Sequence, residues 1–118
     1  DIAISTVNIC DLIPTDTTYV AESSAIAFGT DPEISLSDTR DTDAGEYIAP
    51  GTTTTAAAVP GIGICRADQN AAQDFTATEN PNGTVWVEID NALTPVPAGQ
   101  AGYVRFRVLV NETAFGIP

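Results

Sequence analysis

The chain of 118 residues is strongly acidic: 16 Asp and Glu residues stand against four Arg, with no Lys or His, giving a formal charge of −12. Without His or Lys there is no imidazole base for a Ser or Cys nucleophile, no Schiff-base lysine and no P-loop lysine. The charge argues against nucleic acid as a partner, and no apolar run approaches the roughly 20 residues that membrane insertion requires. These features predict one non-enzymatic domain over residues 1–118.

The first half of the chain consists of short β-rich segments between turn residues, with almost no helical periodicity. Pro14 ends the first of these segments, in which Val7 and Ile9 alternate with polar residues. A long irregular stretch runs from Ser37 to about Gly61. The predicted strands before residue 66 are the segment of Val7 and Ile9, and residues 17–20, 25–28, 34–36 and 62–65.

The two clearest strands come last, at residues 84–89 and 103–110. In the first, Val85, Val87 and Ile89 share one face and Trp86 lies on the other. In the second, apolar residues alternate with Arg105 and Arg107. If the two strands pair, Glu88 would meet an Arg, and an Arg would lie over Trp86; if they cross to opposite sheets, these contacts vanish.

Half-buried strands separated by turns predict an all-β fold, an immunoglobulin-like β-sandwich in a single domain. Cys10 and Cys65 are the only cysteines. Two Cys without His cannot complete a zinc site, so we predict a disulfide and an oxidising, extracellular or cell-surface location. The alternative is a pair of buried free thiols in a cytosolic protein.

Several motifs follow one another in an order that resembles a known family. They are residues 8–20 (NICDLIPTDTTYV), 41–51 (DTDAGEYIAPG), 80–85 (NPNGTV) and 98–108 (AGQAGYVRFRV). The chain is thereby similar to the bacterial conserved-repeat domains catalogued as domain of unknown function eleven, in the form common in cyanobacterial surface proteins. The resemblance covers about residues 4–110. It implies an extracellular immunoglobulin-like module of envelope proteins, adhesins and filaments, with no catalytic residues.

The resemblance also implies one or two strands before the 8–20 motif, whereas here only residues 1–6 precede it. Since the chain opens on Asp1 rather than Met, an upstream segment is expected to have been removed or left out. We therefore expect a sandwich that lacks leading strands and is completed by a neighbouring subunit through β-strand addition. The predicted function is a structural subunit that self-associates into a bacterial filament or surface layer, with residues 111–118 or 1–5 as the donor strand.

Two alternative functions remain open at this point. One is an adhesin-type module that binds a ligand or carbohydrate, with Trp86 and Tyr103 as a sugar platform, although a buried aromatic is the simpler interpretation of each. The other is a fragment of a longer, multi-repeat cell-surface protein. Asn82-Gly83-Thr84 and Asn111-Glu112-Thr113 match the N-glycosylation pattern, and the run of Thr at 52–55 could carry O-linked glycans.

An acidic cluster is the one candidate metal site. Asp38, Asp41, Asp43 and Glu46 lie close together in the sequence beside Gly45, and oxygen ligands around a glycine turn suit Ca²⁺. The spacing does not match an EF-hand loop, and a solvated acidic loop near Arg40 is the simpler interpretation. Calcium is the only metal that the sequence suggests, and no other cofactor is expected.

Overall fold

The computed structural model describes residues 6–40, 45–90 and 99–112. Within these residues the protein is mostly β, built of several small antiparallel sheets, and its helical segments are two short 3₁₀ turns. No helix among them is long or apolar enough to cross a membrane. The elements are β1 Thr6–Leu12, β2 Thr17–Tyr19, β3 Ala25–Phe28, β4 Ile34–Ser35, β5 Gly45–Ile48, η1 Ile62–Cys65, η2 Ala77–Glu79, β6 Thr84–Asp90, β7 Gly102–Arg105 and β8 Val108–Val110.

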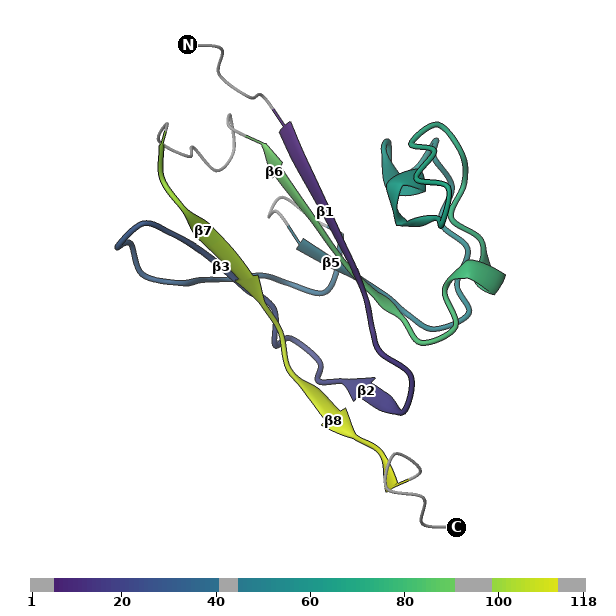
Figure 1. The fold of residues 1–118 in the computed structure, drawn as a ribbon, viewed down its shortest axis with the longest axis horizontal. Coiled ribbons are helices and arrows are strands. Elements are labelled where there is room, and N and C mark those ends of the chain that lie inside the picture. The colour runs from purple at the N-terminus through teal and green to yellow at the C-terminus, as the bar shows by residue number, and fades with distance from the viewer. Residues whose placement is uncertain (1–5, 41–44, 91–98, 113–118) are drawn as a thin grey trace.

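The strands form three sheets, with the orders β1-β6-β5, β4-β3-β7 and β2-β8. Strand β6 is the centre of the first sheet and pairs along its whole length with β1, from Thr6 opposite Asp90 to Leu12 opposite Thr84. In Figure 1, β3 and β7 lie on one side of β1 and β6, and the teal and green loops between β5 and β6 lie on the other. The central sheet therefore has a different neighbour on each face.

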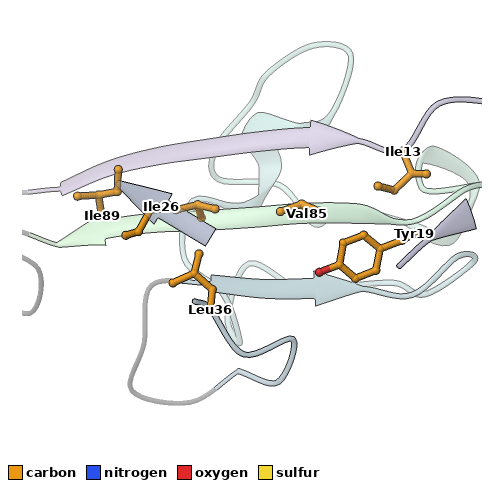
Figure 2. Packing of buried hydrophobic residues seen from close by; sticks show 7 residues of the cluster. Ile13, Tyr19, Ile26, Leu36, Val85 and Ile89 are labelled. Atoms are coloured by element: carbon orange, nitrogen blue, oxygen red, sulfur yellow. The ribbon is translucent and has the colours of Figure 1, made fainter. Parts of the chain in front are cut away.

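The inner face of the β1-β6-β5 sheet packs against the other two sheets. Because side chains alternate along a strand, β6 turns Val85, Val87 and Ile89 to this face. They belong to a buried set that we call the inner cluster, shown in Figure 2. Its members are Ile13, Tyr19, Ile26, Leu36, Val85, Val87 and Ile89. Each of the three sheets thus contributes to one apolar core.

The outer face of the same sheet is covered by residues 49–80, which we call the covering segment. Trp86, a residue only 3% exposed, packs there with residues from this segment. The buried members of this outer cluster are Ile48, Val59, Ile62, Cys65, Phe75 and Trp86. The burial predicted for Trp86 is confirmed.

Most of the predicted strands are present, with three differences. Residues 62–65 form the 3₁₀ helix η1 rather than a strand, because Gly61, at a φ of 87°, turns the chain so that Ile62 and Cys65 enter the outer cluster. Strand β5 lies within the stretch expected to be irregular. Its pairing with β6 is non-local, so the sequence around Tyr47 gives little local signal for it.

The third difference is that the predicted strand 103–110 is broken into β7 and β8. Strand β7 pairs with β3, whereas β8 pairs with β2. Between them, the Arg107 carbonyl accepts the Val20 N–H at 2.9 Å, and the Arg107 N–H donates to Ser23 Oγ at 3.0 Å. The backbone therefore stays satisfied while it passes from one partner strand to the next.

The last two predicted strands do not pair with each other. Strand β6 lies between β1 and β5, and β7 is in another sheet, so the crossing arrangement is the one observed. Arg105 instead makes a two-pronged ion pair with Glu33, at 2.5 Å from Nε to Oε2 and 2.6 Å from one terminal nitrogen to Oε1. Trp86 faces the covering segment and not an arginine.

Candidate functional site

An apolar groove lies between β1 of the central sheet and β7 of the β4-β3-β7 sheet. It encloses a volume of about 370 Å³. Its floor is the inner face of β6, and its walls come from the two flanking strands. The lining residues are Ile9, Asp11, Phe28, Val85, Val87, Ile89, Gln100, Gly102, Tyr103 and Val104.

Both strands that border the groove are edge strands. In the described part of the chain, β1 pairs with β6 alone and β7 pairs with β3 alone. Each strand therefore keeps a row of backbone N–H and C=O groups without a strand partner, and such rows are templates for pairing with another strand. The groove thus has a strand edge on each side.

Apolar side chains continue to the mouth of the groove. Val7 lies on the inner face of β1, since it pairs with Ile89, and the residue is 40% exposed. Tyr103, on β7, is 52% exposed and donates its hydroxyl to Glu33 at 2.8 Å. Asp11 is the one charged residue in the lining. The groove therefore favours an apolar, uncharged occupant.

Position 102, in the β7 wall of the groove, has room only for glycine. Gly102 pairs with Phe28, and a Cβ at this position would collide with the Phe28 ring and the Ala27 carbonyl. Gly102 and Gln100 lie in a motif on which the family resemblance was based, but nothing in that motif indicated a groove. The groove arises from the relative placement of β1, β6 and β7, which are distant in the sequence.

The Cys10–Cys65 disulfide is confirmed, with a Cα–Cα distance of 5.5 Å. It joins the edge strand β1 to η1 in the covering segment, on the face of the sheet opposite the groove. Asn8, on the same face of β1, has a buried Oδ1 atom without a hydrogen-bond partner among the described residues. The disulfide therefore anchors β1, the strand that forms one wall of the groove.

The four acidic residues of the candidate calcium site are only partly described. Asp41 and Asp43 lie outside the described residues. The Asp38 carboxylate accepts the Tyr19 hydroxyl at 2.6 Å and the Glu22 N–H at 2.7 Å. Among the described residues there is no group of three or more potential ligands that could hold a metal. The calcium site stays a prediction.

Asp38 and Glu46 lie on different sides of strand β5. Tyr47 stacks on Tyr19 with ring centroids 4.1 Å apart, on the side where Tyr19 meets Asp38. Strand alternation turns Glu46 to the other side, level with Trp86. Burial raises the pKa of the Glu46 carboxyl, partly offset by Arg40, and its Oε2 atom is buried without a hydrogen-bond partner in the described chain.

A sugar platform of Trp86 and Tyr103 does not form. Trp86 is buried under the covering segment, whereas Tyr103 is exposed on a different sheet. The two aromatic residues therefore offer no shared surface to a ligand. The interpretation of Trp86 as a buried aromatic is correct, and that of Tyr103 is wrong.

The first glycosylation motif is also partly buried. Thr84 is fully buried and donates its hydroxyl to Asn80 Oδ1 at 2.8 Å. The hydroxyl that completes the Asn82-Gly83-Thr84 motif is therefore inaccessible in the folded chain. In the second motif, Thr113 lies outside the described residues.

Comparisons of the chain with protein-family models, with curated proteins and with solved structures gave no match. The family resemblance stays a prediction.

Proposed function

We propose that this chain is a non-enzymatic, extracellular structural subunit that assembles into a filament or surface layer by β-strand addition between copies. The observation that carries the proposal is the groove between β1 and β7, apolar along its floor and bounded on both sides by strand edges that have no partner among the described residues. A strand from a second copy would bury alternate side chains in the groove and hydrogen-bond to the edges.

The proposal includes an immunoglobulin-like sandwich as the underlying architecture. One layer would be the β1-β6-β5 sheet, and the other the β4-β3-β7 and β2-β8 sheets together. Support comes from the inner cluster, in which Val87 of the first layer packs with Ile26 and Tyr19 of the second. Between β1 and β7 this sandwich would lack one strand, at the position of the groove.

An extracellular location agrees with the disulfide, which persists in oxidising compartments. It also agrees with the charge of −12, which keeps single copies soluble through mutual repulsion. Since acidic copies repel one another, the contact that joins them should be mainly apolar and backbone-mediated. The groove, with Asp11 as its single charged lining residue, has this character.

The second candidate function is a ligand-binding module, favoured by the size of the groove. Its volume of about 370 Å³ lies at the lower end of the range of roughly 300–1,000 Å³ for small-molecule sites. Such sites usually combine an apolar wall with several convergent polar groups. Here the side-chain polar groups are few, Asp11, Gln100 and Tyr103, and Tyr103 is engaged by Glu33. Strand addition uses the unpaired backbone edges as well, so we prefer it.

Two substitutions on β1 test the proposal as a matched pair. Val7 and Leu12 are similarly exposed, at 40% and 43%, but Val7 faces the groove side and Leu12 the opposite side of the strand. Val7→Glu places a charge beside the apolar groove and should abolish assembly, whereas Leu12→Glu should leave assembly unchanged. Light scattering after size-exclusion chromatography, together with negative-stain electron microscopy, measures the outcome.

The controls separate folding from assembly. Both variants should keep the wild-type far-ultraviolet circular dichroism spectrum and a similar thermal midpoint, since both positions are half-exposed. A wild-type chain that stays monomeric at high concentration contradicts the proposal. So does equal assembly of the wild type and Val7→Glu.

A further inference from the structure

We infer that the strand which fills the groove is residues 113–118 of a second copy of this chain, Thr113-Ala114-Phe115-Gly116-Ile117-Pro118. This inference rests on the proposed function, since it names the occupant of the same groove. The sequence alone left two donors open, residues 1–5 and residues 111–118, and the chemistry of the groove now distinguishes them.

The segment has the alternation that the groove requires. In an extended chain Thr113, Phe115 and Ile117 share one face, with a repeat of about 6.6 Å. The floor of the groove has the same repeat, because Val85, Val87 and Ile89 are alternate residues of β6. Phe115 and Ile117 could therefore settle between successive floor side chains. Pro118 lacks an N–H and would end the added strand.

Charge favours the same segment over residues 1–5. Residues 113–118 contain no ionisable side chain, whereas residues 1–5 begin with Asp1. A carboxylate brought to the groove would approach Asp11, the one charged residue in its lining. No Arg stands among the described residues that line the groove, so no compensating cation is supplied by the lining. A donor without an ionisable side chain avoids this repulsion between side chains.

Distance disfavours the same copy as the source of these residues. The groove wall on β7 begins at Val104, six residues before Val110, or about 20 Å along an extended chain. To reach it, residues 111–118 would have to reverse direction, which takes roughly two to four residues. The remaining residues, about 13–20 Å of strand, would at best touch the near end of the groove.

The end of β8 and strand β7, which borders the groove, lie at different places along the molecule. In Figure 1, β8 ends at the far end of the molecule from the start of β1, and β7 lies on the same side as the beginning of β1. The longest dimension of the molecule is 54 Å. The end of β8 thus lies away from β7, which borders the groove, as head-to-tail growth of a polymer requires.

Full-length variants test the donor. Phe115→Glu should abolish assembly, and Ile4→Glu, the matched change in residues 1–5, should not. Mixing Phe115→Glu, which has an intact groove, with Val7→Glu, which has an intact donor, should restore a contact and give a one-to-one complex that cannot grow. The mass of this complex, measured by light scattering, is the readout, and its formation shows that the Phe115→Glu variant, which supplies the groove, is folded.

The possible outcomes separate this inference from the proposed function. If Ile4→Glu abolishes assembly and Phe115→Glu does not, the donor is residues 1–5; the inference is overturned while strand addition stands. If both variants assemble like the wild type, neither segment is the donor, and the inference is again overturned. If the wild type itself remains monomeric, both the inference and the proposed function fail.

A synthetic peptide of residues 111–118 provides a second measurement that does not depend on a variant. Added in excess to wild-type chains before assembly, it should occupy the grooves and shorten or prevent polymers. A peptide of residues 1–6 is the matched control and should have no effect. The inference is overturned if the two peptides act equally or if the control alone inhibits.

Discussion

The two faces of the β1-β6-β5 sheet are closed in different ways. On the outer face, residues 49–80 cover Trp86, and a disulfide joins them to β1. On the inner face, Val85 and Val87 are buried by other sheets, yet they also line an open groove at the β1 edge. Trp86 and Val87 are adjacent residues of β6. Trp86 therefore faces a covered core, whereas Val87 faces a core that opens into the groove.

The difference indicates that, among the described residues, one strand edge stays open while a long segment closes another face. The covering segment is held by its own network of contacts. Arg66 binds Asp68 at 2.9 Å and Glu79 at 3.1 Å, and it also donates to the Asp74 carbonyl at 3.0 Å. Nothing comparable covers the groove between β1 and β7 among the described residues.

Among variants that alter the covered outer face, removal of the disulfide should lower the free energy of unfolding most. The Cys10→Ser, Cys65→Ser double variant frees the covering segment from β1 and opens a loop with a sequence separation of 55. Loop-closure entropy predicts a loss of about 4 kcal/mol in the free energy of unfolding. Urea unfolding measures it, with the wild type before and after reduction as the control. An unchanged midpoint would show that the apolar contacts alone seal the outer face.

A smaller effect is expected at the buried polar anchor of the covering segment. Asn80 is fully buried, donates to the Ala49 carbonyl at 2.8 Å and accepts the Thr84 hydroxyl. Asn80→Ala leaves those two groups without this partner, at a cost of about 1–3 kcal/mol. Urea unfolding gives the loss, and Asn82→Ala, a less buried asparagine in the same turn, is the matched control. Equal losses in the two variants would argue against a special role of Asn80.

The smallest effects concern two glutamates with opposite pH dependence. Burial raises the pKa of the Glu46 carboxyl, so stability is lost as pH rises through the folded pKa and the group becomes charged. Glu46→Gln should therefore raise the thermal midpoint at pH 7, but not below about pH 4.5.

Hydrogen bonds from Arg105 and then Tyr103 lower the pKa of Glu33 from 4.5 to about 2. Its contribution is complete above pH 4.5 and is lost as pH falls toward 2.

Glu33→Gln should accordingly lower the midpoint slightly at pH 7, the opposite sign to Glu46→Gln, because the Glu33 ion pair is largely exposed. Thermal unfolding between pH 2 and pH 7 compares the two variants with the wild type. If both substitutions shift the midpoint in the same direction, the contrast between a desolvated and a paired carboxylate is wrong.

The parts of the fold that could be predicted are those with a local signal. The period of two in residues 84–89 placed Val85, Val87 and Ile89 on one face and Trp86 on the other, since alternation is a property of a single strand. The disulfide could be predicted because only two cysteines are present. The local signal was misleading at residues 62–65. Their apolar side chains predict a strand, but they form the 3₁₀ helix η1.

The sequence by itself determined that the chain is β-rich, acidic, without His or Lys, and able to form one disulfide, because composition and side-chain alternation are local properties. Only the tertiary structure decided that β7 pairs with β3 and β8 with β2, and that β1 and β7 flank a groove. Strand pairing joins residues far apart in the sequence, and its choice depends on which faces can be buried together. The open edge is therefore a property of the assembled sheets, and no single segment encodes it.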